Sequence, residues 1–142
     1  MFAVTPYISF PDGKCKAALK FYQEVLGAEI FKDKDGKEEL MLFAGSDMET
    51  PENKELIMHV HFKVGDAHIM ASDVTDSSQV LVGTNITLGI GGFKDKAQVD
   101  QVFTALSAGG TVIMPLSDQF WGAYFGILKD KFDIQWMFSF DY

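Results

Sequence analysis

The 142-residue sequence predicts an α+β protein of two β-α-β-β-β modules, which form a curved mixed sheet with helices on its outer face. Two observations predict this fold. The spacing of apolar residues changes from alternation to a three-to-four period and back, twice and in the same order. Glycine also follows the helical stretch in each half, as is typical of a left-handed helix end. Because one module cannot cover its own apolar sheet face, two copies, at about 1–75 and 84–142, are expected to stack within one domain.

The first module begins with a strand and turns into a helix at Asp12-Gly13. This helix ends at Gly27, and the residues on its apolar face are Ala18, Phe21, Tyr22 and Val25. Strands are expected at 3–10, 28–31, 56–64 and 67–73. Only Gly65-Asp66 separates the last two strands, which indicates a tight hairpin.

The second module repeats this order after a polar connection. Its helix is predicted from the spacing of Val99, Val102, Phe103 and Leu106, and Gly109-Gly110 end it. Strands are expected at 85–90, 111–116, 123–128 and 134–140. The concave face of the combined sheet is then the only large cleft and the expected place for a ligand.

Composition excludes several classes of function. Twelve basic against 20 acidic residues give a net charge of −8, so we expect no nucleic-acid partner. No run approaches the roughly 18 apolar residues of a membrane span, and the first residues lack a cationic start before an apolar stretch. We therefore expect a cytoplasmic protein without a membrane partner. Cys15 is the only cysteine, which excludes an intrachain disulfide and a thiolate zinc site.

Strand alternation sorts side chains into a core face and a cleft face. His59 and His61 point the same way, and the hairpin turn places His61 across from Met70. The candidate ligand-binding residues are Tyr7, Ser9, His59, His61, Met70, Ser72, Asn85, Thr87, Trp121, Tyr124 and Met137. The hydroxyl residues either orient a polar ligand or bond to neighbours on the sheet. The aromatic pair near residue 122 either caps the cleft or fills a core or a dimer contact.

Several motifs resemble a known family. They are Pro6-Tyr7-Ile8-Ser9-Phe10, the segment 21–27 (FYQEVLG), the segment 58–73 from Met58-His59-Val60-His61-Phe62 to Ser72-Asp73, and the segment 114–126 with Trp121-Gly122. In this order, along a duplicated β-α-β-β-β plan, they resemble the glyoxalase/bleomycin-resistance/dioxygenase superfamily, also called vicinal oxygen chelate proteins. The PhnB-like branch is the most similar. The resemblance implies a homodimer that binds a small molecule.

Metal-dependent members of that superfamily hold one divalent ion with four side chains. The resemblance places these four positions at Tyr7, Met70, Asn85 and Met137. Thioethers prefer soft ions, and neutral amides and phenols contribute little charge to a hard cation. We therefore expect neither a metal nor another cofactor. A dinucleotide is not expected either, because Gly89-Ile90-Gly91-Gly92 lacks the G-x-G-x-x-G spacing.

The two histidines of the third strand leave an alternative open. His59-x-His61 presents two imidazoles on one face, a spacing that one metal ion accepts. A third ligand is missing, because the hairpin register places His68 near Lys63 instead. The two imidazoles would otherwise line the pocket as hydrogen-bonding groups.

Three functions remain open from the sequence. The first is a binder of a small organic molecule without an obligatory metal. The second is a lyase or isomerase that uses His59 and His61, either with a metal or in acid-base catalysis. The third is a resistance-type protein that sequesters an aromatic drug on Met and Trp surface.

Overall fold

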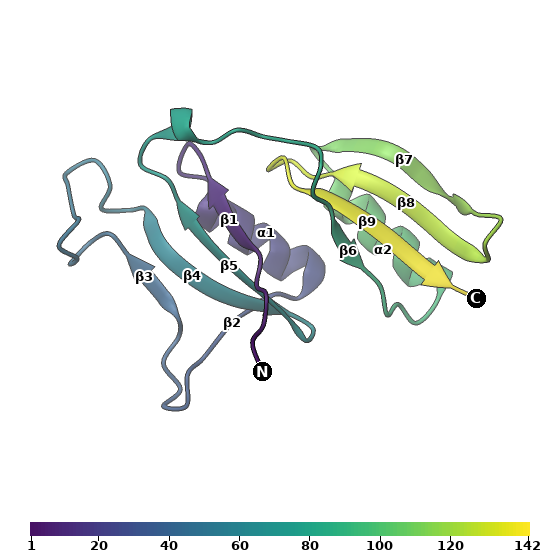
Figure 1. The fold of residues 1–142 in the computed structure, drawn as a ribbon, viewed down its shortest axis with the longest axis horizontal. Coiled ribbons are helices and arrows are strands. Elements are labelled where there is room, and N and C mark those ends of the chain that lie inside the picture. The colour runs from purple at the N-terminus through teal and green to yellow at the C-terminus, as the bar shows by residue number, and fades with distance from the viewer. The chain divides into compact units, whose positions relative to one another are not determined.

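Each half of the chain folds as a sheet with a helix on one face, in a computed structural model that describes residues 1–142 (Figure 1). The halves form two compact units, Met1–Leu81 and Val82–Tyr142. The N-terminal unit contains β1 (Tyr7–Phe10), α1 (Cys15–Leu26), β2 (Glu29–Ile30), β3 (Leu40–Leu42), β4 (Ile57–Val64), β5 (Ala67–Asp73) and a 3-10 turn, η1 (Ser77–Gln79). Its strand order is β1-β5-β4-β2, and β3 also pairs with β4.

The C-terminal unit repeats this plan. It contains β6 (Leu88–Ile90), α2 (Lys96–Ser107), β7 (Thr111–Asp118), β8 (Ala123–Lys129) and β9 (Gln135–Asp141). Its strand order is β6-β9-β8-β7. In both units the first strand runs parallel to the last one, and the remaining pairs are antiparallel. The mixed α+β fold predicted from the sequence is confirmed.

The core of the N-terminal unit lies between α1 and its sheet. Tyr22 of α1 stacks on Phe62 of β4, with ring centroids 6.3 Å apart. The side chain of Lys14 does not cap the start of this helix. The carboxylate of Asp73 takes that role, since it accepts the backbone N–H of Cys15 at 2.9 Å. The helix ends at Gly27, whose φ of 68° is the left-handed conformation predicted for this position.

The core of the C-terminal unit lies between α2 and its sheet. Phe103 of α2 meets Phe138 of β9 edge to face, with centroids 5.1 Å apart. Asp95 caps the helix by accepting the N–H of Gln98 at 2.8 Å. Gly109 follows the helix with a φ of 75°, in agreement with the predicted stop. Neither helix has the length and apolar character that crossing a membrane requires.

Two strands begin several residues later than predicted. The strand expected at 3–10 begins at Tyr7, because Pro6 has no N–H to donate to a neighbouring strand. The strand expected at 85–90 begins at Leu88, since β9, the strand that it pairs with, begins only at Gln135. Asn85 therefore lies outside the sheet, which corrects its predicted place on a strand.

One strand was not predicted. β3 pairs with β4 through Leu40↔Val60 and Met41↔His59. Asp35-Gly36 between two apolar segments is the turn signal that indicates this strand, because such a pair favours a hairpin. The expected 65–66 hairpin is confirmed, with Val64 opposite Ala67 and His61 opposite Met70.

Candidate functional site

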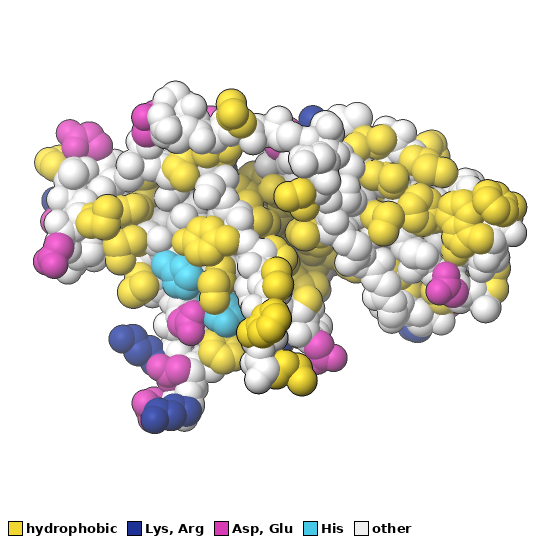
Figure 2. Space-filling view, viewed as in Figure 1, with side chains coloured by type: hydrophobic (Ala, Val, Ile, Leu, Met, Phe, Trp, Pro, Cys, Tyr) yellow, Lys and Arg dark blue, Asp and Glu magenta, His cyan; other side chains and the backbone are white.

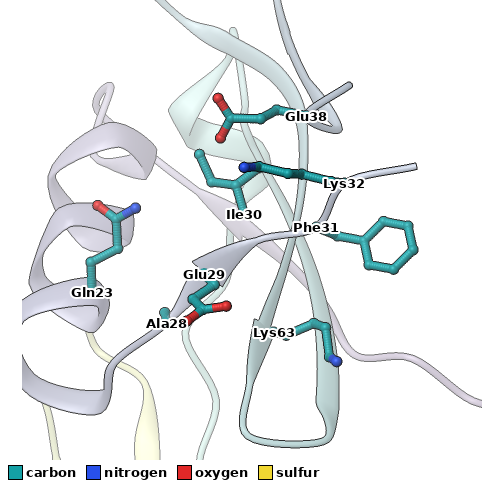
Figure 3. A pocket seen from close by; sticks show the side chains of 8 residues that line it. All are labelled: Gln23, Ala28, Glu29, Ile30, Phe31, Lys32, Glu38 and Lys63. Atoms are coloured by element: carbon teal, nitrogen blue, oxygen red, sulfur yellow. The ribbon is translucent and has the colours of Figure 1, made fainter. Parts of the chain in front are cut away.

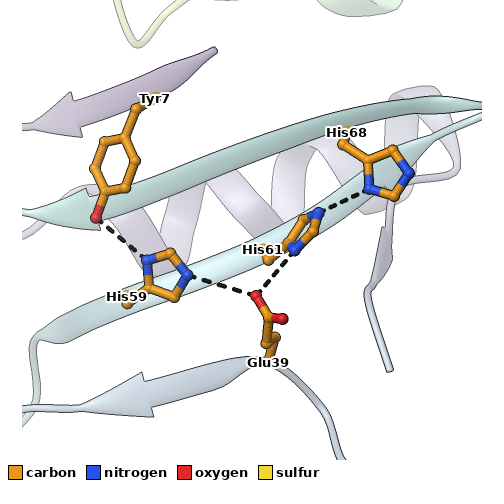
Figure 4. A network of polar contacts seen from close by, with 5 residues as sticks. All are labelled: Tyr7, Glu39, His59, His61 and His68. Carbon is orange, nitrogen blue, oxygen red and sulfur yellow. Dashed lines mark hydrogen bonds and ion pairs between the residues drawn. The ribbon is translucent and has the colours of Figure 1, made fainter. Parts of the chain in front are cut away.

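Five polar side chains form a continuous network on the sheet of the N-terminal unit (Figure 4). We call it the histidine network, and its members are Tyr7, His59, Glu39, His61 and His68. The Tyr7 hydroxyl lies 3.3 Å from His59 Nδ1. Glu39 Oε2 lies 3.6 Å from His59 Nε2 and 2.9 Å from His61 Nδ1. His61 Nε2 lies 2.7 Å from His68 Nδ1.

Strand register explains why these residues meet. His59 and His61 alternate along β4, so both point away from α1, whereas Phe62 points toward it. The β4–β5 register pairs Lys63 with His68, which makes His68 a diagonal neighbour of His61. Glu39 reaches the same place because its backbone carbonyl accepts the N–H of His61 at 2.9 Å.

The network runs from solvent into a covered position. Tyr7 is 50% exposed at one end, whereas His61 is only 8% exposed. The ring of Phe31 covers His61, with centroids 4.5 Å apart and planes inclined by 16°. Phe31 also lies 5.6 Å from the ring of His68. Figure 2 shows that histidine side chains still reach the surface, beside acidic and apolar groups.

The network can hold and move protons. A carboxylate that contacts two imidazoles can accept a hydrogen bond from either ring, and it attracts a positive charge at hydrogen-bond distance. Partly buried imidazoles with fixed partners are typical of acid-base sites. The geometry therefore supports both polar ligand binding and proton transfer.

The other candidates of the N-terminal unit share this face. In the parallel β1–β5 pair, Tyr7 is the partner of Met70 and Ser9 is the partner of Ser72. Because His61 is opposite Met70, both pairs lie on the side of the sheet that carries the histidines. The structure thus brings six sequence-predicted residues together on one face, namely Tyr7, Ser9, His59, His61, Met70 and Ser72.

The candidates of the C-terminal unit are more dispersed. Asn85 precedes β6 and is exposed, whereas the Thr87 hydroxyl accepts a hydrogen bond from Gln135 at 2.7 Å. Met137 of β9 is the partner of Gly89 in β6. Trp121 lies in the turn after β7, is 52% exposed, and contacts Phe125 edge to face.

Tyr124 differs from its predicted place. Its hydroxyl donates to Asp100 of α2 at 2.6 Å, so the side chain lies on the face of the sheet that the helix covers. Met137 is opposite Ile127 and therefore points to the other face, because Tyr124 and Ile127 have opposite parity in β8. The expectation that Tyr124 and Met137 line one cleft is corrected accordingly.

A hollow of about 640 Å³ lies at the β2 edge of the N-terminal sheet (Figure 3). Its lining residues are Gln23, Ala28, Glu29, Ile30, Phe31, Lys32, Glu38 and Lys63. Glu29 is paired with Lys63 across the sheet, and Lys32 is bridged to Glu38 by its backbone. Through Phe31 and Lys63 the hollow adjoins His61 and His68.

The sequence prediction missed two members of the network, Glu39 and His68. Glu39 was missed with β3, and the Asp35-Gly36 turn was the signal that could have found it. His68 was correctly placed opposite Lys63, but the diagonal contact to His61 was not considered. Diagonal partners lie roughly 7–8 Å apart, which imidazole rings can bridge.

The metal site of the vicinal oxygen chelate proteins does not fit these residues. The resemblance places two of its positions at Tyr7 and Met70 in the N-terminal unit, and two at Asn85 and Met137 in the C-terminal unit. A phenol, an amide and two thioethers do not form a ligand set for a hard divalent ion. No group of three or more His, Cys, Asp or Glu side chains has a geometry suited to a metal ion.

The comparisons with known proteins agree with the fold. The model of the Glyoxalase/Bleomycin resistance protein/Dioxygenase superfamily matches residues 5–138, and the chain belongs to this superfamily. YjdN from Escherichia coli (strain K12) is 30% identical over 145 residues, which cover 96% of this chain and 93% of YjdN. The predicted superfamily is confirmed.

Solved structures also resemble the chain. PA1353 from Pseudomonas aeruginosa is 29% identical with a TM-score of 0.79, and the match covers 99% of this chain and 98% of PA1353. A PhnB protein from Bacillus cereus is 21% identical with a TM-score of 0.79, covering 98% and 99% of the two chains. Its likeness shows the shared fold.

Proposed function

We propose that the chain binds a small organic molecule on the histidine-bearing face of its N-terminal sheet, without an obligatory metal. The observation that carries this proposal is the histidine network itself, which places five connected polar groups on one face. Members of this superfamily share the fold, so we infer the ligand from the side chains on the histidine-bearing face and not from the fold.

The surroundings of Tyr7 suit a ligand with polar and apolar parts. The phenol is half exposed and bonds to His59, so its hydroxyl is oriented and accessible. Met70 lies beside it as a flexible thioether that adapts to planar or apolar groups. Ser9 and Ser72 add two hydroxyls farther along the same pair of strands.

The test is a calorimetric screen of small polar aromatic and keto-acid compounds against protein purified without an affinity tag. We expect a compound that binds equally well with and without a chelator. Its affinity should fall about tenfold in Tyr7→Phe, which loses one hydrogen bond to the ligand. The matched control is Tyr124→Phe, whose hydroxyl bonds to Asp100 on a helix-covered face and should leave the affinity unchanged.

Metal analysis of the same preparation completes the test. The proposal predicts no stoichiometric divalent ion. One bound ion per chain that His59→Ala removes would contradict it, as would binding that a chelator abolishes.

A second function, an acid-base lyase or isomerase, is favoured by the contact of Glu39 with both His59 and His61. Such a carboxylate stabilises a protonated imidazole during proton transfer. Turnover should appear in a panel of α-keto acids, thiol adducts and phosphonates, and it should collapse in His61→Gln. No turnover with any compound that binds would reject this function and leave the binding function standing.

We also propose that the chain forms a homodimer, as the superfamily resemblance implied, and that it is cytoplasmic. Sedimentation equilibrium should give twice the chain mass of 15.8 kDa. A chain that sediments at 15.8 kDa across the micromolar range would show a monomer.

A further inference from the structure

His61 uses both of its ring nitrogens within the protein. Nδ1 contacts Glu39 Oε2 at 2.9 Å, and Nε2 contacts His68 Nδ1 at 2.7 Å. His68 has only this one hydrogen bond, so its Nε2 has no protein partner. The three residues therefore form a line that starts at a carboxylate and ends at an unoccupied ring nitrogen.

The Glu39 carboxylate at one end of this line determines where the hydrogens lie. An ionised carboxylate only accepts hydrogen bonds, so His61 Nδ1 carries a hydrogen and donates it to Glu39. In a neutral imidazole the other nitrogen is then an acceptor, so His68 Nδ1 must donate to His61 Nε2. His68 Nε2 is left with a free lone pair.

We propose that His68 Nε2 is the proton acceptor of this site, and that the ligand presents an acidic O–H or N–H group to it. The ligand X–H bond breaks, X keeps the electron pair, and an N–H bond forms at His68 Nε2. The hydrogen on His68 Nδ1 passes to His61 Nε2. The positive charge thus comes to rest on His61, next to Glu39, and the ligand becomes an anion.

Two neighbouring residues shape the surroundings of this line. Phe31 lies flat on His61 and borders His68, so it covers the imidazole end of the contact with Glu39. Lys63 is the cross-strand partner of His68, so its side chain with the ammonium group leaves the sheet on the same face. The same ammonium attracts an anionic ligand, although Glu29 opposite Lys63 offsets part of its charge.

The ligand class in this inference rests on the proposed function. The arrangement of protons in the ligand-free chain does not. Glu39 and His61 act through His68, which makes them positioning residues. Their effect is measurable without any ligand, because the tautomer of each imidazole has a distinct ¹⁵N chemical-shift pattern.

The first experiment is long-range ¹H–¹⁵N NMR of the ligand-free chain at neutral pH. We expect His68 with a hydrogen on Nδ1 and none on Nε2, and His61 with a hydrogen on Nδ1. In Glu39→Gln the His68 pattern should shift toward the hydrogen on Nε2, which free imidazole side chains prefer. Glu38→Gln is the control, because it removes the neighbouring carboxylate, which lines the hollow, and leaves Glu39 in place. A hydrogen on Nε2 of His68 in the unaltered chain would overturn the proposal.

The second experiment uses 4-nitrophenol and its methyl ether as matched probes. The phenolate absorbs visible light, so absorbance reports transfer of the proton directly. We expect 4-nitrophenol to bind at least about tenfold more tightly than the ether and to bind as the phenolate, and His68→Gln to remove both differences. Equal binding of the two probes, or no binding of either, would refute the ligand class. The NMR result would then still decide where the hydrogens lie on His61 and His68. Binding of the phenol without ionisation would refute the transfer and leave the proposed function intact.

Discussion

The Asp130 carboxylate and the Trp136 indole are joined by a buried hydrogen bond, in which Nε1–H donates to Oδ2 at 2.9 Å. The other carboxylate oxygen accepts the backbone N–H of Phe132 at 2.8 Å and that of Ile134 at 3.1 Å. Asp130 is only 1% exposed, so one side chain shapes the β8–β9 turn and fixes the indole against the core.

Replacement of Asp130 by Asn should lower the free energy of unfolding by about 1–3 kcal/mol. Both carboxylate oxygens of Asp130 accept hydrogen bonds from N–H groups, and the amide NH₂ that replaces one of them cannot accept such a bond. Urea denaturation followed by Trp fluorescence measures the change. The control is Asp133→Asn, since Asp133 is an exposed residue whose ion pair with Lys129 spans 3.7 Å. It should change the free energy by less than about 0.5 kcal/mol. Equal effects of the two substitutions would contradict the role of Asp130.

Cys15 should be unreactive in the folded protein. Burial, and secondarily the Asp73 carboxylate, raise the pKa of the Cys15 thiol to about 12. The thiolate is the reactive form, so labelling by a disulfide reagent at pH 8 should be slow in the native protein and fast in urea. Rapid native labelling would contradict the buried position.

The same pKa predicts a loss of stability in alkali. The folded pKa lies above the unfolded value, so the folded chain holds the thiol proton more tightly than the unfolded chain does. The resulting contribution to the free energy of unfolding is complete below about pH 9.0 and is lost as pH rises toward about 12. Unfolding free energies at two pH values in that window should fall less in Cys15→Ala than in the unaltered chain. Parallel falls in both proteins would show that Cys15 contributes nothing to the pH dependence.

Gly110 should not tolerate a side chain. A Cβ there would overlap the carbonyl oxygen of Lys129 and lie 2.9 Å from Asp130 Cα, and both are backbone atoms that cannot rotate away. We expect Gly110→Ala to destabilise the chain by about 3 kcal/mol or to prevent folding. Gly91→Ala is the control, because its Cβ would make an ordinary 3.5 Å contact with Ser139. Thermal melts of the two variants that coincide would contradict this close approach.

Tyr124 should ionise later than an ordinary tyrosine. The hydrogen bond to Asp100 raises the pKa of the Tyr124 hydroxyl, with smaller effects of the same sign from burial and from the charges of Asp100 and Asp118, while Lys96 opposes them. Spectrophotometric titration should show one phenol step move to lower pH in Asp100→Asn. An unchanged titration curve would show that the 2.6 Å contact does not persist in solution.

Pattern reasoning predicted the elements that depend on local signals. The φ of 68° at Gly27 and the Gly65-Asp66 hairpin follow from glycine conformation and strand alternation, which a single segment already displays. Alternation also predicted that His59 and His61 share a face. These predictions needed no knowledge of which distant segments meet.

Pattern reasoning failed where pairing between distant segments decides the outcome. β3 is only three residues long, and its place beside β4 depends on a loop between them rather than on its own periodicity. Glu39 enters the network through this pairing. Tyr124 was misplaced because β8 is apolar on both faces, so alternation alone does not show which face α2 covers.

In each sheet the first strand pairs only with the strand that is synthesised last. β9 lies between β6 and β8, and β5 lies between β1 and β4. During synthesis on the ribosome, β6 therefore waits without a neighbour until β9 leaves the exit tunnel. The N-terminal sheet, by contrast, has all of its strands by residue 73 and can close while the rest of the chain is still being translated.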